Sequence, residues 1–155
     1  MMARIESCLD KLTDNQIWLR GSDNANAVGN LCLHLAGNVR QWIGFGVAGQ
    51  PDIRARDREF TARSGVNKSE LRERLAVAVA DAAQTIESLP PEDLMRKTRI
   101  QNYDVTVMEA IYHVVEHFAG HTGQIIFVTK ALTGEDLGFY SHLAAPAEHG
   151  QSITK

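Results

Sequence analysis

The sequence predicts an all-α fold, a four-helix bundle, and three observations lead to this prediction. Four segments carry apolar residues at the three- and four-residue spacing of an amphipathic helix. Strand-like alternation is confined to one short stretch that suits a hairpin. The chain has 155 residues, of which 44% are hydrophobic and 23% charged, as expected for a globular domain. We therefore expect a single four-helix-bundle domain over residues 1–155.

The first helix is expected over about residues 3–12, where apolar side chains share one face: Ile5, Cys8, Leu9 and Leu12. Thr13 and Gln16 follow it with the spacing of a capping box, which favours a short helical turn. The bundle therefore starts with a short helix and one further turn.

The second helix is expected to begin after Asn26, a suitable N-cap residue, and to run to about Val47. Its apolar face consists of Val28, Leu31, Leu35, Val39 and Trp42. Residues 49–68 are polar and rich in turn-forming residues. We expect a loop with at most one helical turn there, whose charges at 54–59 are solvated or salt-bridged rather than part of a substrate clamp.

The third helix is expected over about residues 69–89, because Pro90-Pro91 cannot continue it. Residues 92–105 are predicted to be extended or irregular. The alternation over residues 98–107 favours a small hairpin that turns near Gln101-Asn102.

Thr106 and Glu109 then form a capping box that begins a long fourth helix. This helix ends near Leu132, ahead of Gly134. Residues 138–155 are expected to form a packed segment followed by a loose tail.

Composition excludes several classes of function. A net charge of −3 and an isoelectric point near 6.0 provide no basic surface for nucleic acid. No apolar run approaches the roughly 18–20 residues that cross a bilayer, so we expect no membrane span. Cys8 and Cys32 both lie among apolar residues and are interpreted as buried thiols in a reducing cytoplasm. The expected location is therefore cytoplasmic.

Three histidines follow one another at four-residue intervals in the fourth helix, at positions 113, 117 and 121. Imidazoles one turn apart can converge on a single metal ion. His113 and His121 are eight residues apart, roughly 12 Å along a helix, so all three cannot bind together. His117 and His121 are turned toward the apolar face, and we therefore predict that this pair binds while His113 stands aside.

A second polar feature lies on the second helix, where Asn30, His34, Asn38 and Gln41 form one stripe. Between Asn24 and Pro51 the chain has a single charged residue, Arg40. An uncharged polar row on an apolar helix indicates an enclosed, hydrogen-bonding surface rather than one that faces water. His34, as a good metal ligand, would complete a three-histidine site with His117 and His121 across the bundle.

Each of these features also has a less specific interpretation. An HxxxH pair alone is a weak signal, since surface histidines often show it, and His34 alone is more often a hydrogen-bonded core histidine. Gly120 and Gly123 each cost a helix about 1 kcal/mol relative to alanine. A ligand or a partner helix close to the histidines would explain Gly120, but simple helix packing would explain it as well.

The residues together resemble the DinB-like family of metalloenzymes. The resemblance rests on NAVGNLCLH at 26–34, LAGNVRQWI at 35–43 and EHFAGHTGQII at 116–126, and it extends to RARDREF at 54–60 and KALTGEDLGFY at 130–140. It implies a four-helix bundle that shares its architecture with bacterial thiol-dependent S-transferases. It also implies a divalent metal, zinc or nickel, held by His34, His117 and His121, and it makes a homodimer the expected assembly.

A divalent ion held by three neutral imidazoles keeps an open position, where it would lower the pKa of a bound water toward about 7 or ionise a bound thiol. The leading hypothesis is a metal-dependent transferase that joins a small thiol to a small electrophile. A metal-dependent hydrolase and a non-catalytic metal-binding or dimerising bundle are the alternatives. The residues expected to surround the ion or line the substrate pocket are His113, Asn38, Gln41, Gly120 and Gln124.

Overall fold

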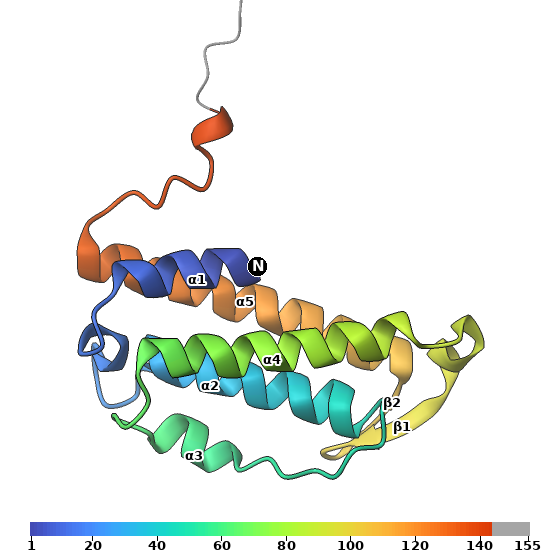
Figure 1. Ribbon diagram of the computed structural model, residues 1–155. Coiled ribbons are helices and arrows are strands. Elements are labelled where there is room, and N and C mark those ends of the chain that lie inside the picture. The colour runs from blue at the N-terminus through green and yellow to red at the C-terminus, as the bar shows by residue number, and fades with distance from the viewer. Residues whose placement is uncertain (144–155) are drawn as a thin grey trace, which may run out of the picture.

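The computed structural model describes residues 1–143 and confirms the predicted helical bundle (Figure 1). Four long helices form the bundle: α1 (Met2–Lys11), α2 (Val28–Val39), α4 (Lys68–Glu87) and α5 (Val107–Thr133). A short helix, α3 (Arg56–Thr61), lies outside the bundle on the far side of α2 in Figure 1. The expected loop over residues 49–68 thus contains one short helix, close to the single turn that was predicted.

The shorter elements connect these helices: η1 (Gln16–Trp18), η2 (Arg40–Phe45), η3 (Pro91–Met95), β1 (Lys97–Ile100), β2 (Tyr103–Thr106) and η4 (Ser141–Leu143). The two strands pair antiparallel, with Ile100 opposite Tyr103. Gln101, at the turn, has a φ of 55°, in the left-handed region that tight hairpin turns require. The hairpin and its turn therefore stand where the alternation predicted them.

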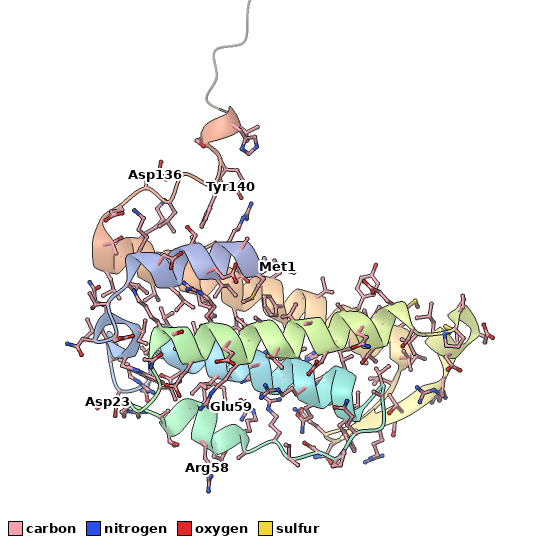
Figure 2. All side chains as sticks on the ribbon, viewed as in Figure 1. Met1, Asp23, Arg58, Glu59, Asp136 and Tyr140 are labelled. Carbon is pink, nitrogen blue, oxygen red and sulfur yellow. The ribbon has the colours of Figure 1, made fainter. Side chains whose placement is uncertain are left out.

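Helix packing places α2 at the centre of the fold. It contacts α4, α3 and α5, while α1 packs along α5 (Figure 1). Side chains fill the space between the long helices (Figure 2). The largest fully buried ones come from every layer: Ile5, Leu9, Leu31, Leu35, Leu75 and Ile125. Burial of each stabilises the fold by about 1.5–3 kcal/mol, so the core fixes α2 against α5.

Three of the four helix caps that the sequence predicts are observed. Thr106 Oγ1 accepts a hydrogen bond from the Glu109 amide at 3.2 Å, and Gly134 ends α5 with a φ of 71°. The Asn26 N-cap prediction is wrong, because the N-cap residue of α2 is Ala27. Asn30, in the first turn, accepts the Ala27 amide hydrogen with its own side chain at 3.1 Å, so the cap comes from inside the helix.

The second helix changes its winding before its expected end. Residues 40–45 form a π-helical segment instead of continuing as an α-helix to Val47. Gly46 follows this segment, and a Cβ there would overlap the Ile100 side chain and the Trp42 carbonyl oxygen. The altered winding and the missing side chain together let the hairpin pack closely against the end of α2.

Neither cysteine belongs to a disulfide, and both are buried as expected. Burial raises the pKa of Cys32 to about 12, so its sulfur stays a thiol. Within residues 1–143 there is no helix that combines the length and the apolar character required to cross a bilayer. Of the segment predicted to pack at 138–155, η4 is observed, and residues 144–155 lie outside the described part of the chain.

Gly46→Ala is predicted to destabilise the protein by about 1–3 kcal/mol, because the new methyl group must displace Ile100 or the backbone of η2. Urea denaturation measures this change. Gly21→Ala is the matched control, since a Cβ at Gly21 would meet no described atom within 4 Å. Equal stability of the two variants would show that the hairpin does not depend on this close approach.

Candidate metal centre

Three histidines from α2 and α5 come together where these two helices pack. His34 projects from α2, and His117 and His121 project from consecutive turns of α5. One ring nitrogen from each of these residues lies within 4.8 Å of the other two. These are the three side chains that the sequence predicted to converge, and the group could hold a metal ion.

The spacing of the nitrogens suits a shared ion. The Nε2 atoms of His34 and His117 are 2.8 Å apart. Two nitrogens that bind one tetrahedral zinc ion at about 2.0–2.1 Å lie about 3.3 Å from each other. His34 and His121 also meet edge to face, with ring centroids 5.0 Å apart. The donor set, three imidazoles, could therefore hold a divalent metal ion.

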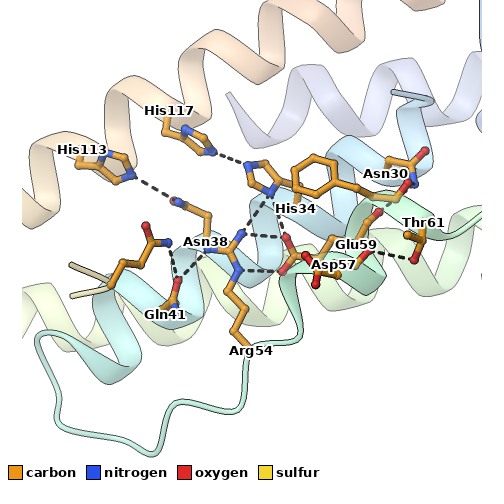
Figure 3. A network of polar contacts seen from close by, with 12 residues as sticks. Asn30, His34, Asn38, Gln41, Arg54, Asp57, Glu59, Thr61, His113 and His117 are labelled. Atoms are coloured by element: carbon orange, nitrogen blue, oxygen red, sulfur yellow. Dashed lines mark hydrogen bonds and ion pairs between the residues drawn. The ribbon is translucent and has the colours of Figure 1, made fainter. Parts of the chain in front are cut away.

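His34 is oriented by a carboxylate. Its Nδ1 lies 2.9 Å from Oε2 of Glu59, and both residues are buried (Figure 3). The Nδ1 nitrogen must donate, because a lone pair there would face the carboxylate oxygen. This tautomer leaves the Nε2 lone pair directed at His117. A carboxylate behind a histidine is the usual partner of a metal-binding imidazole.

Arg54 holds Glu59 in turn. Its Nε and Nη2 each donate to one carboxylate oxygen of Glu59 at 2.8 Å, and its Nη1 donates to Gln41 Oε1 at 2.9 Å (Figure 3). The Nη2 atom is also 3.1 Å from His34 Nδ1, since both nitrogens share the same oxygen of Glu59. Burial opposes ionisation of Glu59, but the hydrogen bonds from Arg54 and His34 outweigh it and lower its pKa.

Space for Glu59 comes from a glycine on α2. A Cβ at Gly37 would overlap the Glu59 carboxylate. Asn30 fixes the same residue from its backbone side, because its amide donates to the Glu59 carbonyl oxygen at 2.8 Å and to that of Ala62 at 3.0 Å. Figure 2 shows Glu59 on the bundle side of α3, while Arg58 points away.

His121 is also oriented, in this case by its own helix. Its Nδ1 lies 2.8 Å from Oε1 of Gln124, one turn later on α5. An amide oxygen accepts hydrogen bonds, so Nδ1 carries the hydrogen and Nε2 keeps its lone pair. Gln124, predicted to lie around the ion, therefore contacts one of the three histidines directly.

His113 lies outside the group of three. Its ring stacks on Trp42 with centroids 3.8 Å apart, and its Nε2 is 3.4 Å from Nδ2 of Asn38. The buried Asn38 thus contacts His113, and the half-buried Gln41 contacts Arg54. Both lie around the histidines, as the uncharged stripe on α2 predicted. The enclosed character expected of this stripe is confirmed for Asn30, His34 and Asn38, which are all buried.

A cleft of about 270 Å³ opens beside the histidines on α5. Its lining consists of His113, Glu116, His117, Gly120, His121 and Gln124. No described atom lies within 4 Å of where a Gly120 Cβ would be, so no helix of the same chain packs closely there. The cleft leaves room for a guest molecule next to the histidines.

Burial favours the uncharged form of the three histidines on α5. Desolvation, followed by the proximity of the other histidines, lowers the pKa of His117 to about 4. Desolvation also lowers the pKa of His113 and that of His121, although the hydrogen bond with Gln124 partly opposes the latter shift. Neutral imidazoles are the form that binds metals, so the site is prepared for a cation.

Sequence reasoning missed Arg54 and Glu59 as parts of this site. Their segment was expected to be solvated or salt-bridged; the salt bridge is present, but both side chains are buried. No local pattern marks them, since Glu59 continues the charged run of residues 54–59 and its burial depends on Gly37, which lies opposite it on α2. The Phe60 ring also packs 4.6 Å from the His34 ring.

The fold and the histidine cluster define the class of protein: a helical bundle of the DinB-like type, consistent with a metal-binding protein. The chain belongs to the family described as "Protein of unknown function (DUF1572)", whose model matches residues 1–147. None of the curated proteins matches the chain.

Three solved bacterial structures show the same fold. A conserved protein from Enterococcus faecalis has a TM-score of 0.74 at 16% identity, over 86% of this chain and 91% of its own. A DinB-like protein, YjoA, from Bacillus subtilis has a TM-score of 0.66 at 15% identity, over 90% and 91%. A DinB-like protein from Bacillus cereus has a TM-score of 0.66 at 13% identity, over 86% and 88%. At these identities the likeness shows the fold alone.

The metal-free protein is predicted to lose stability as the pH falls from about 6.5 toward 4. In this window the unfolded chain protonates His117 at its ordinary pKa of 6.5, whereas the folded state keeps it neutral down to about 4. The pKa of Glu59 is lowered from its ordinary value of 4.5. The stability that this residue contributes is therefore lost only below about pH 4.5. Urea denaturation across this pH range measures the slope of the free energy of unfolding against pH. An unchanged slope in His117→Asn would show that another group is responsible.

Proposed function

We propose that His34, His117 and His121 bind a divalent metal ion, zinc or nickel, and that the protein is a metal-dependent transferase for a small thiol. The observation that carries the metal site is the convergence of the three ring nitrogens within 4.8 Å of one another. Glu59 and Gln124 support it, because each fixes the Nδ1 hydrogen of one histidine and leaves Nε2 free.

The reaction proposed for this site joins a thiol to an electrophilic carbon. The sulfur–carbon bond forms, the bond to the leaving group breaks with its electron pair on that group, and the thiol proton departs with it. When bound, the ion supplies the positive charge that favours the thiolate over the thiol. Three protein ligands and an adjacent cleft of about 270 Å³ leave space for both reactants.

The chain's own residues position and enclose the reactants. The buried Glu59 keeps the His34 ring from rotating, and Trp42 holds the His113 ring at one end of the cleft by stacking. The two free cysteines are buried, so neither competes as a nucleophile, and they suit a reducing, cytoplasmic location.

A metal-dependent hydrolase is the second candidate. Glu116 favours it, because this carboxylate lines the cleft beside the histidines, where it could act as a general base toward water. A non-catalytic metal-binding bundle is the third candidate, and it needs no reactant in the cleft.

The proposed ligands are tested by the metal content of purified variants. His34→Ala, His117→Ala and His121→Ala are each predicted to lose bound metal, because each removes one of three ligands. His113→Ala is the matched control, since it removes a histidine of the same helix and should keep the metal. Elemental analysis measures the ratio of bound metal to protein. Full occupancy in His34→Ala would contradict a site that joins α2 to α5.

Glu59→Gln is predicted to weaken zinc affinity about 10–100-fold without removing a ligand, because the amide cannot accept from both His34 and Arg54 as the carboxylate does. Competition with a chromophoric chelator measures the affinity. Glu109→Gln is the control, since Glu109 is exposed and caps α5 away from the histidines. An affinity equal to that of the control would show that Glu59 does not position His34.

The reaction is tested with a panel of small thiols, each offered with an alkyl halide or an epoxide, and with a panel of esters. Thiol consumption that needs both the metal and His117 supports the transferase. Ester cleavage that depends on the metal and on Glu116, without thiol consumption, would replace it with the hydrolase. If the metal-loaded protein turns over neither panel, the non-catalytic candidate stands.

A further inference from the structure

A second hollow lies next to the histidine cleft, between the second half of α5 and the start of α2. We call it the groove, and its volume is about 380 Å³. Its lining consists of Asn26, Leu31, Gly123, Gln124, Phe127 and Val128. None of these six residues is charged, and the larger side chains among them are mostly apolar. The groove therefore suits an uncharged, apolar group of a small molecule.

The groove adjoins the cleft beside the histidines. Gln124 lines both hollows, and its Oε1 lies 2.8 Å from Nδ1 of His121. Residues that recur every three or four positions share one face of a helix. The α5 residues that line the two hollows follow this spacing: His113, Glu116, His117, Gly120, Gly123, Gln124 and Phe127. A molecule held at the histidines can thus extend along the same face of α5 into the groove.

Two glycines give this face of α5 its hollow shape. Gly120 lines the cleft and Gly123 lines the groove. Glycine is one of the least favourable residues inside a helix. A Cβ at either position would meet no described atom within 4 Å, so packing within this part of the chain requires neither glycine. Space for a guest molecule accounts for both of them, because a larger side chain would occupy that space.

Phe127 forms an exposed wall of the groove. This residue is 74% exposed, whereas Val128 is half-buried and Leu31 is buried. An apolar guest would cover the Phe127 ring and contact the other two side chains, which removes apolar surface from water. A charged guest would lose its hydration and find no charged partner in the groove. The lining therefore selects by polarity as well as by size.

The two hollows can divide the reactants between them, and this step rests on the proposed function. A thiol that binds the ion must place its sulfur at the three histidines. The cleft of about 270 Å³ has room for a small thiol there. The electrophile must approach the same sulfur, and the groove offers its remaining carbons an apolar surface next to the cleft.

We propose that the groove binds the apolar group of the electrophile. The preferred electrophiles then carry an uncharged alkyl or aromatic group of several carbons, rather than a methyl group or a charged one. Gly123 determines this specificity by leaving the space open, and Phe127 determines it by covering the apolar group. Gln124 is a positioning residue, because it holds His121 at the point where the two hollows meet.

Binding of straight-chain primary alcohols, from 1-propanol to 1-heptanol, tests the groove without any reaction. These alcohols carry the apolar group of an alkyl halide but no halide leaving group. We expect the dissociation constant to fall roughly fourfold for each added methylene group until the groove is full, because each methylene buries a similar apolar area. NMR titration of the full chain measures these constants. A constant that does not change along the series would overturn the proposal.

Gly123→Leu is expected to weaken the binding of 1-heptanol about tenfold or more, because the new side chain fills the groove. Ala119→Leu is the matched control, since it adds the same side chain to an exposed residue of α5 that lines neither hollow. Leucine favours a helix more than glycine does, so Gly123→Leu should fold, and circular dichroism checks both variants. Equal binding of 1-heptanol by the two variants would contradict the proposed place of the alkyl group.

Phe127→Ala is expected to weaken the binding of 1-heptanol roughly fivefold, because it removes one apolar wall. Tyr112→Ala is its control, since Tyr112 is on the same helix, is 73% exposed and lines neither hollow. A groove that a second copy of the chain covers would give another result. The wild type would then bind no alcohol, and Phe127→Ala would change the sedimentation of the chain, which would overturn the proposal.

Kinetics assign the groove to one reactant. With the thiol held constant, kcat/KM is expected to rise with the length of the alkyl halide. Lengthening the thiol against a constant halide should change kcat/KM little, and a dependence on thiol length alone would overturn the assignment to the electrophile.

The outcomes also separate this inference from the proposed function. Alcohol binding that follows chain length, without turnover of any thiol, would contradict the transferase and leave the groove as an apolar binding site. Turnover that does not depend on the length of either reactant would contradict the groove and leave the transferase standing.

Discussion

The buried contact between Glu59 and His34 links every part of this structure that bears on function. It joins α3 to α2, it sets the tautomer of His34, and it needs Arg54 to neutralise a carboxylate that is largely withdrawn from water. A buried charge without a partner is strongly destabilising. Removing any one of these three side chains is therefore expected to destabilise the other two. The segment outside the bundle is therefore as important for the histidine group as the helices that carry the histidines.

The same contact explains why α2 has its unusual composition. Helix α2 tolerates Gly37 because the carboxylate of Glu59 occupies the space of the missing side chain. Asn30 both caps the first turn of α2 and holds the backbone of Glu59. An uncharged polar stripe, which would be out of place on a solvent-facing helix, is the surface on which α3 docks.

Local patterns predicted most of the fold, because amphipathic spacing, capping boxes and prolines act within a few residues. The convergence of His34 with His117 and His121 was also predictable, since helical angles turn His117 and His121 inward and the uncharged stripe around His34 indicates an enclosed surface. The roles of Arg54 and Glu59 were not, because whether a charged residue is buried depends on what lies opposite it in space. The π-helical winding at 40–45 also escaped prediction: it lies where the end of α2 meets the hairpin, which comes about 50 residues later in the chain.

The donors come from two different helices, and this has a consequence for the choice of ion. His117 and His121 belong to α5, whereas His34 belongs to α2. The distance from the His34 nitrogen to the other two is therefore set by how closely α2 and α5 approach. If the proposed metal binds there, the packing between α2 and α5 would set the ionic radius that the three donors accommodate. Enlarging or trimming a buried apolar side chain would shift the preference among ions while every donor atom remained in place.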